Sequence, residues 1–489
     1  MNIISSVQLP LGEYWELILL AVHVVMATGV TIHSILYKRE TRAAIGWTGL
    51  AWLAPIVGSL LYFFLGVNRI QRKATRLGVQ DALGKKPEFL VNPSDRKRVT
   101  SANEHYPNLA GLALVGQRLT GKNALPGNEI VPLEDGDETY PAMVEAIDNA
   151  QQSVALLSYI FDNDRAGNVI VDALVRARDR GVAVRVLVDD VGSKYSKVNI
   201  VKRLKKLGVD AASFLPTKFG RLPQFANLRN HRKILVVDGK TGFTGGTNIR
   251  EAHWLGLDPG YPTKCLHFRL RGPVVAHLQE MFVIDWAFAT GEQLSGDTWF
   301  PKIDRCGEIW ARGIAHGPDE DFETLSKIIF AALASARERV RIVTPYFIPD
   351  SRLIESLSVA SLKGVDVEVY LPSNNNVPIV NWAAAAQLDL FLQHGCSVYQ
   401  TRPPFDHTKL LLIDDAWALI GSTNWDPRSL RLNFEFNVEC FDKDFVQSLH
   451  HLVDHKAVDC QMITLEQVNS LPFLTKIRNG LARLLSPYL

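Results

Sequence analysis

The chain has 489 residues, and its 53 Lys and Arg nearly balance its 51 Asp and Glu, which leaves a formal net charge of +2 at pH 7. So small a charge argues against nucleic acid as a partner, because a phosphate backbone is bound by a clear excess of positive charge. The five cysteines are scattered and form no Cys-x-x-Cys pair, so neither a disulfide framework nor a metal site is indicated.

Two apolar stretches near the N-terminus predict a helical hairpin that associates with a membrane, within residues 1–75. Residues 17–37 are almost wholly apolar, and residues 45–67 contain no charged residue. As helices, both are long enough to cross a hydrocarbon core about 30 Å thick. Pro55 favours a kink in the second stretch, so that this stretch either spans the membrane or lies shallowly in it. The remaining alternative is a hairpin buried in a soluble core.

The basic residues around the hairpin give a divided prediction of its orientation. Residues 38–42, between the two stretches, contain three basic residues, and four more follow the second stretch, at Arg69, Arg72, Lys73 and Arg76. A spanning hairpin puts these two groups on opposite sides of the membrane. We expect the region that follows to face the cytoplasm, and only a shallow hairpin would bring both groups to that side.

Past a linker at residues 76–125, the pattern of the chain repeats. Residues 154–159 parallel residues 340–346, and residues 181–189 parallel residues 364–372, each at a point where a helical stretch gives way to an apolar strand. Strands that alternate with helices predict an α/β fold. We therefore expect two pseudo-symmetric α/β sandwich lobes, residues 126–300 and 301–489, related by a pseudo-two-fold axis and meeting at a central cleft.

Each lobe contains the same motif, in which Lys follows His by two residues, Asp follows Lys by five and Asn follows Asp by ten. The residues are His231, Lys233, Asp238 and Asn248 in the first lobe, and His407, Lys409, Asp414 and Asn424 in the second. The apolar, β-branched run between Lys and Asp predicts a strand, and residues two apart on a strand share a face, so His and Lys project together. The glycines before each Asn allow a tight turn that returns the amide to them.

These side chains suit phosphate chemistry. An ammonium and an amide can hold the non-bridging oxygens, and an imidazole can attack phosphorus or move a proton. Cleaving a phosphodiester through a covalent intermediate needs two imidazoles, which accounts for the duplication. Asp238 and Asp414 are predicted to be structural anchors, because a further negative charge would repel phosphate. The alternative is two unrelated buried strands that each contain a stray histidine.

The duplicated motif resembles the signature of the phospholipase D superfamily, and the resemblance covers residues 125–489. It implies a catalytic set of His231, Lys233, Asp238, His407, Lys409 and Asp414, acting through a phosphohistidine without metal or other cofactor. His231 is then the nucleophile and His407 the general acid and base, in the order that is common in the family and that the sequence alone does not set. The two lysines with Asn248 and Asn424 would hold the phosphate.

Glu435 lies 28 residues after His407 on a predicted strand. The resemblance implies that its carboxylate accepts a hydrogen bond from that imidazole and fixes the tautomer. A solvent-facing strand glutamate is the alternative. At the same offset from His231 the chain has Pro259, so the group that orients the first imidazole stays unassigned.

The apolar segment 47–66, together with Ser158-Tyr-Ile-Phe161 and Asp426-Pro-Arg-Ser429, resembles bacterial cardiolipin synthases. That resemblance implies transfer of a phosphatidyl group from one phosphatidylglycerol to another, giving cardiolipin and glycerol at the bacterial inner membrane. A membrane-bound phospholipase D hydrolase, or a phosphatidyltransferase with another acceptor such as phosphatidylethanolamine, remains open. A nuclease would have little use for the apolar segments, and both intact motifs argue against a scaffold without activity. The oligomeric state is not indicated.

The C-terminus predicts an amphipathic helix. Leu474, Ile477, Leu481, Leu484 and Leu485 recur at helical spacing, with Lys and Arg residues between them. Such a helix either lies on an anionic bilayer or packs its apolar side chains on the second lobe.

Overall fold

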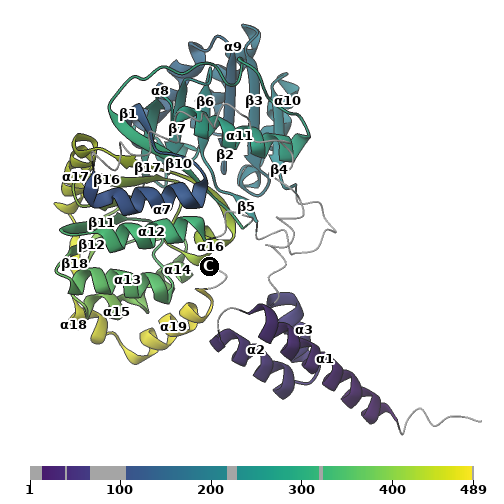
Figure 1. Cartoon of the computed structure of the whole chain (residues 1–489). Coiled ribbons are helices and arrows are strands. Elements are labelled where there is room, and N and C mark those ends of the chain that lie inside the picture. Colours follow the sequence, from purple (N-terminus) through teal and green to yellow (C-terminus); the bar gives the residue numbers. More distant parts are fainter. Residues whose placement is uncertain (1–13, 39–40, 67–105, 217–227, 319–322, 487–489) are drawn as a thin grey trace, which may run out of the picture. The chain divides into compact units, whose positions relative to one another are not determined.

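The computed structural model describes residues 14–38, 41–66, 106–216, 228–318 and 323–486. The chain forms two units, Met1–Arg72 and Lys73–Leu489 (Figure 1). Most of the predicted linker and the basic residues between 69 and 76 lie outside the described residues.

The first unit contains the predicted hairpin, with one long helix rather than two. Helix α1 (Trp15–Tyr37) is, among the described residues, the one helix long and apolar enough to cross a membrane. The second stretch is divided into α2 (Thr41–Leu53), α3 (Val57–Leu61) and the π-helical turn η1 (Tyr62–Gly66). The break falls at Pro55, which cannot donate a backbone hydrogen bond, and at Ile56, whose φ is 61°. The expectation of two helices of spanning length is therefore not met.

A continuous sheet in the second unit has the same strand order in each lobe. In the first lobe the order is β1 (Leu125–Glu134), β9 (Leu266–Arg271), β7 (Thr241–Gly245), β6 (Ile234–Val237), β2 (Ser153–Ser158), β3 (Ala183–Asp189) and β4 (Asp210–Phe214). In the second it is β10 (Ile309–His316), β17 (Asn433–Phe441), β16 (Trp417–Gly421), β15 (Leu410–Ile413), β11 (Arg339–Val343), β12 (Asp366–Pro372) and β13 (Ser397–Thr401), with β18 (Gln461–Ile463) at the edge.

The pairing directions repeat as well. The last three of the seven equivalent strands are parallel in each lobe, and the other neighbours are antiparallel. The lobes join where the equivalent strands β1 and β10 pair antiparallel. The predicted α/β fold with two pseudo-symmetric lobes is confirmed by this arrangement.

Helices flank this sheet, and the last two, α18 and α19, pack on helices α15 and α14 (Figure 1). They are α8 (Asp135–Asp148), α9 (Arg165–Asp179), α10 (Ile200–Lys206) and α11 (Val275–Thr290) in the first lobe, and α7 (Ala110–Thr120), α12 (Thr324–Ser335), α13 (Ser351–Leu362), α14 (Pro378–Ala385), α15 (Leu388–Leu392), α16 (Pro427–Arg431), α17 (Lys443–Ala457), α18 (Leu465–Asn469) and α19 (Phe473–Leu484) with the second. In α9, Ile170, Leu174 and Ala177 recur at helical spacing and are fully buried in the core of the first lobe. Asp164 begins that helix by accepting a hydrogen bond from Gly167 N at 2.8 Å.

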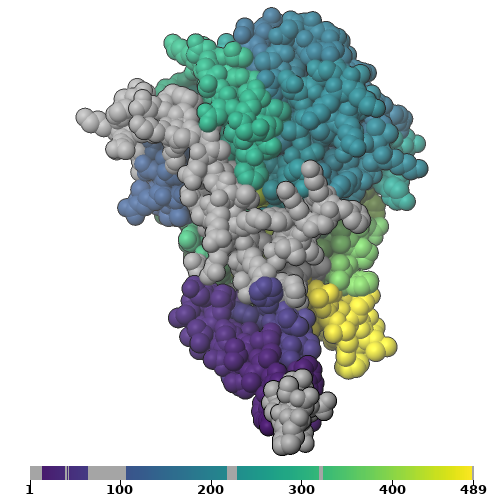
Figure 2. Space-filling view, turned by 90° about the vertical axis from the view of Figure 1, so that its right-hand side faces the viewer, coloured from purple at the N-terminus to yellow at the C-terminus, as the bar shows by residue number. Residues whose placement is uncertain are grey.

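Helix α19 is the predicted amphipathic helix. It contacts α14 through another face, on which Asn479 and Ala482 are buried, and the Arg478 guanidinium lies 4.6 Å from the Trp382 ring. Its large apolar side chains are exposed, with Leu474 at 78%, Leu481 at 60% and Leu484 at 71%. Figure 2 shows the C-terminal residues, in yellow, at the molecular surface.

Two short strand pairs cross between the lobes. Strand β5 (Arg229–Asn230), just before His231, pairs with β17 of the second lobe. Strand β14 (Phe405–Asp406), just before His407, pairs with β8 (Thr263–Lys264) of the first lobe. The backbone N–H groups of His231 and His407 then donate to Phe434 O at 2.9 Å and Lys264 O at 2.7 Å. Each motif histidine is thus positioned by the opposite lobe.

Each motif aspartate stabilises a turn within its own lobe. The Asp238 carboxylate accepts from the backbone N–H groups of Gln151, Gln152 and Ser153 at 2.7–3.2 Å, and the residue has a φ of 50°. Asp414 caps the equivalent turn before β11 in the same way. Neither aspartate lines the central cavity.

Replacing Asp238 with alanine should lower the free energy of unfolding by about 1.5–3 kcal/mol, because three N–H groups lose a charged acceptor and alanine tolerates the positive φ poorly. Denaturant unfolding of wild type and Asp238→Ala would measure this. An Asp238→Asn variant is the control and should lose less, since its amide oxygen still accepts. Equal stability of the alanine variant and the wild type would show that the carboxylate does not hold this turn.

Candidate active site

A cavity of about 880 Å³ lies between the two lobes of the second unit. Both motif histidines and both motif asparagines line it, together with tyrosine, asparagine and arginine side chains from each lobe. The structure therefore brings together the histidines and asparagines of the duplicated motif in one cavity, as their spacing predicted.

His231 is paired with an acid of the other lobe. Its Nδ1 lies 3.0 Å from the Glu435 carboxylate, which is fully buried. An Nδ1–H that donates to this carboxylate leaves the Nε2 lone pair available. The assignment of Glu435 to His407 from the sequence offset is therefore corrected. Because β5 pairs with β17, the acid on β17 reaches the histidine of the first lobe, which lacked an assigned partner.

Glu435 is itself fixed by two side chains that sequence reasoning missed. Ser422 Oγ donates to its Oε2 at 2.5 Å, and Asn433 Nδ2 donates to its Oε1 at 3.3 Å. Burial alone raises the pKa of Glu435, but His231, Lys233 and Ser422 together bring it below its usual value. The group is thus a carboxylate. Ser422 belongs to the Gly-Ser pair that was interpreted only as a turn.

His407 has a neutral partner instead. Its Nδ1 lies 3.0 Å from the carbonyl oxygen of Gly246, which belongs to the glycine turn of the first lobe. This contact again leaves Nε2 available. A carbonyl stabilises a developing imidazolium less than a carboxylate does. Both imidazoles therefore have the same tautomer. A positive charge is stabilised more strongly on His231 than on His407.

Burial keeps both imidazoles neutral before an anion binds. Burial lowers the pKa of His231 to about 4 against the opposing effect of Glu435. Burial, with Lys409 and other cations nearby, lowers the pKa of His407 well below its usual value. A bound phosphodiester would raise both pKa values, because an adjacent negative charge favours the imidazolium.

The two lysines are nearly inaccessible to solvent. Lys233 Nζ donates to His231 O at 2.8 Å, and Lys409 Nζ donates to His407 O at 2.6 Å. Burial lowers the pKa of Lys233 to about 7 and that of Lys409 to about 8, although Glu435 opposes the shift in each. Each ammonium group is thus held at the backbone oxygen of its own motif histidine. Because water has little access to it, its attraction for an anion is strong.

The asparagines are only partly engaged by the protein. The Oδ1 atoms of Asn248 and Asn424 are buried and have no hydrogen-bond partner among the described residues. Asn424 Nδ2 donates to Ser429 Oγ at 3.2 Å. As acceptors, these Oδ1 oxygens suit a ligand hydroxyl that donates a hydrogen bond, whereas an asparagine holds a phosphate oxygen through its Nδ2 group.

Two further rings lie against the histidines and were not found from the sequence. The Tyr159 ring centroid is 4.9 Å from that of His231, and the His253 ring centroid is 5.7 Å from that of His407. Tyr159 lies in the Ser158–Phe161 segment that carried part of the family resemblance, whereas His253 belongs to no motif.

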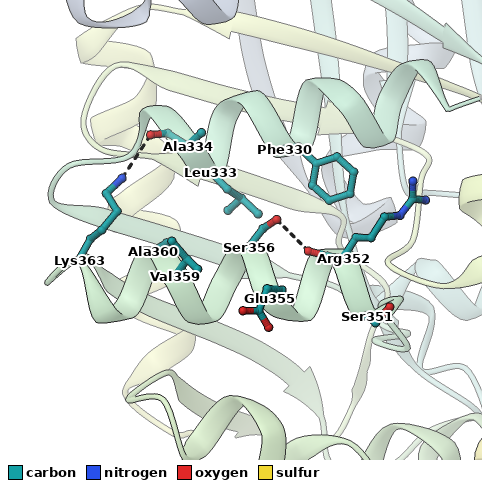
Figure 3. Close-up of a pocket in the computed structure, with 10 residues that line it drawn as sticks. All are labelled: Phe330, Leu333, Ala334, Ser351, Arg352, Glu355, Ser356, Val359, Ala360 and Lys363. Carbon is teal, nitrogen blue, oxygen red and sulfur yellow. Dashed lines mark hydrogen bonds between the residues drawn. The ribbon is translucent and has the colours of Figure 1, made fainter.

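Another hollow, between α12 and α13, has a volume of about 580 Å³ and lacks these features (Figure 3). Its cations are already engaged, since Lys363 Nζ donates to Ala334 O and Arg352 pairs with Asp350. No histidine lines it. The cavity between the lobes is therefore the candidate active site.

Comparison with known proteins agrees with this site. The family model described as "Cardiolipin synthase, PLD-like domain" matches residues 143–258 and 329–456, which contain both motifs. The chain is 32% identical to "Cardiolipin synthase 2" of Staphylococcus epidermidis, over 93% of this chain and 94% of the relative. It is 29% identical to "Major cardiolipin synthase ClsA" of Bacillus subtilis, over 92% of this chain and 95% of that protein.

These findings show a phospholipase D-like protein of two fused lobes. Within that class, the chain belongs to the family of cardiolipin synthases. Among solved structures, the fold is similar to phosphatidylserine synthase of Haemophilus influenzae, with a TM-score of 0.60 at 13% identity, over 77% of this chain and 100% of that one. This likeness concerns the fold alone.

Proposed function

We propose that this protein is a phosphatidyltransferase that makes cardiolipin and glycerol from two molecules of phosphatidylglycerol. The observation that carries the proposal is the pair of buried histidines, one from each motif, which leave their Nε2 atoms available at one cavity. Membership of the cardiolipin synthase family supports this choice of reaction.

In the first step Nε2 of His231 attacks phosphorus of the donor lipid, and the bond between phosphorus and the glycerol oxygen breaks. His407, protonated next to the bound anion, gives its Nε2 proton to the leaving oxygen. Glu435 stabilises the positive charge that develops on His231. Lys233, Lys409 and the motif asparagines hold the non-bridging oxygens.

In the second step a terminal hydroxyl of another phosphatidylglycerol attacks phosphorus and gives its proton to His407. The bond between phosphorus and His231 breaks, which releases cardiolipin and restores both imidazoles. Water could attack in place of the lipid alcohol, so the outcome depends on which nucleophile the cavity admits.

The test is to incubate the purified protein with phosphatidylglycerol bilayers and to measure cardiolipin, free glycerol and phosphatidic acid by mass spectrometry. We expect cardiolipin and glycerol in equal amounts. Phosphatidic acid in place of cardiolipin would make the protein a hydrolase. Cardiolipin formed only after phosphatidylethanolamine is added to the bilayers would change the acceptor.

The rate should fall as the pH rises through about 7 to 8, because Lys233 and Lys409 hold phosphate only when they are protonated and their pKa values lie there. Initial rates of kcat/KM across the neutral and alkaline range would show this limb. Arginine keeps a charge that does not titrate in this range. The alkaline limb of Lys233→Arg should therefore move up to the pKa of Lys409, about 8, and the double variant Lys233→Arg with Lys409→Arg should lose this limb. An unchanged alkaline limb in both variants would contradict the assignment.

We further propose that α1 anchors the protein in the bacterial inner membrane and that the lobes face the cytoplasm. Cys306 is exposed and Cys460 is partly exposed, whereas Cys265, Cys396 and Cys440 are buried. A membrane-impermeant maleimide should therefore label Cys306 in inverted membrane vesicles and not in right-side-out vesicles, with Cys306→Ser as the control. Labelling only in right-side-out vesicles would reverse the orientation.

The exposed apolar residues of α19 support a helix that lies on the bilayer, since its contact with α14 uses another face. A double substitution of Leu474 and Leu481 with aspartate should lower turnover of lipid in vesicles about tenfold and leave turnover of a short-chain, water-soluble phosphatidylglycerol unchanged. An equal loss with both substrates would instead indicate damage to the fold.

A further inference from the structure

Three arginines line the central cavity, and two of them are already paired with acids. Arg229 is buried, with Nη1 3.8 Å from Asp189 Oδ1. Arg250 donates from Nε to Asp162 Oδ2 at 3.0 Å, and its Nη2 lies 2.8 Å from the same atom. These two guanidinium groups are neutralised where they stand, so they add little positive charge for a ligand.

Arg428, the third, has no such partner. It is half-buried on the short helix α16. Within the described ranges its guanidinium makes no hydrogen bond, and no carboxylate oxygen lies within 4.0 Å of it. Asp426, two residues earlier, is directed to the helix instead and accepts from Ser429 N at 2.7 Å. The Arg428 guanidinium thus makes no direct ion pair at the wall of the active-site cavity, and Asp426 interacts with it only at longer range.

The same helix provides a comparison. Arg431, at the end of α16, lies 3.4 Å from Asp350 Oδ2 and does not line the cavity. Arg428 therefore faces the cavity, whereas Arg431 on the same helix faces Asp350. The pairing of Arg431 is that of a structural surface arginine, which Arg428 lacks.

The proposed reaction brings a second anion to this cavity. The attacking hydroxyl of phosphatidylglycerol is separated from its own phosphodiester by the three carbons of one glycerol. When that hydroxyl reaches phosphorus on His231, the second phosphate must lie nearby. Lys233 and Lys409 are already committed to the first phosphate. A second anion without its own cation would be repelled and poorly solvated there.

We propose that Arg428 binds the phosphodiester of the acceptor lipid, an inference that rests on the proposed function. The planar guanidinium can donate two parallel hydrogen bonds to one phosphate. It favours an anionic lipid alcohol over water and over uncharged alcohols as the group that resolves the phosphohistidine. Arg428 is thus a specificity-determining residue for the second step, and the donor phosphate does not depend on it.

The experiment is a competition between two acceptors. Wild type, Arg428→Gln, Arg428→Lys and Arg431→Gln are each supplied with phosphatidylglycerol vesicles and ethanol, and the ratio of cardiolipin to phosphatidylethanol is measured. Arg428→Gln should lower this ratio about 10- to 100-fold, the size expected for losing one hydrogen-bonded ion pair. Arg428→Lys should give an intermediate ratio, because lysine keeps the positive charge but cannot donate the two parallel hydrogen bonds of a guanidinium. Arg431→Gln should match the wild type.

Three results would overturn the proposal. If Arg428→Gln lowers both products equally, the residue serves the donor phosphate or the fold. If the ratio does not change, Arg428 does not select the acceptor. Should the glutamine variant not fold, a ratio for Arg428→Lys equal to that of wild type would have the same meaning. Failure of the proposed function itself is seen separately, as an absence of cardiolipin from the wild-type protein.

Discussion

His231→Ala should lose at least about 10³-fold in turnover with every donor, whereas His407→Ala should recover its first step when the leaving group needs no proton. Nitrophenolate leaves as a stable anion, so phosphatidyl-p-nitrophenol is the donor that separates the two roles. His407→Ala should release a burst of nitrophenol, about one per active site, and then turn over slowly.

The physical reason is the difference between the two Nδ1 partners. The Glu435 carboxylate next to His231 stabilises the charge that forms as Nε2 bonds to phosphorus. His407 has only the Gly246 carbonyl and serves to move protons. Removal of a general acid and base lowers the rate about 10²- to 10⁴-fold. With nitrophenolate as the leaving group, the first step needs no proton, so only the second step should be slowed.

Mass spectrometry of peptides from the stopped reaction would locate the phosphatidyl group. It should be found on His231 in the His407→Ala variant, with thermal unfolding as a check that each variant is folded. A burst from His231→Ala, with the adduct on His407, would reverse the assignment of the two roles.

Glu435→Gln should lower kcat about 10²- to 10⁴-fold and change KM little. Glutamine still offers an oxygen to His231 Nδ1, but it removes the negative charge that stabilises the phosphohistidine as it forms. The loss therefore concerns the transition state more than substrate binding. Steady-state rates with phosphatidylglycerol would separate the two constants.

The matched control lies on the same strand. Glu439 is also fully buried on β17, but it pairs with Arg312 and accepts from Trp417 Nε1 at 3.2 Å, away from the histidines. Glu439→Gln should cost about 3–5 kcal/mol of stability, because it leaves a buried cation unpaired, and should keep kcat in the folded fraction. A Glu435→Gln variant that loses stability and retains kcat would assign Glu435 a structural role.

The repeats in the sequence predicted the two lobes because duplicated helix and strand patterns are local properties. Strands β6 and β15 begin one residue after each motif lysine, and the glycine turns return Asn248 and Asn424 to the cavity. The backbone around each motif is thus encoded within its own lobe, which is why spacing alone brought these residues together.

The partner of Glu435 could not be predicted in this way, because the contact joins residues 204 positions apart in different lobes. An offset measured within one lobe carries no information on the strand pairing between lobes. The second apolar stretch shows another limit. Its hydropathy predicted a spanning helix, while the backbone at Pro55 and Ile56 divides it into shorter helices.

Crossed pairing of β5 with β17 and of β14 with β8 also makes catalytic competence all-or-none. Each short strand ends at a motif histidine, so a chain whose lobes are misassembled would misplace both imidazoles at once. It would lose the Glu435 and Gly246 contacts together, because each contact spans the lobes. We therefore expect the nucleophile and its proton donor to be lost together when the lobes fail to assemble.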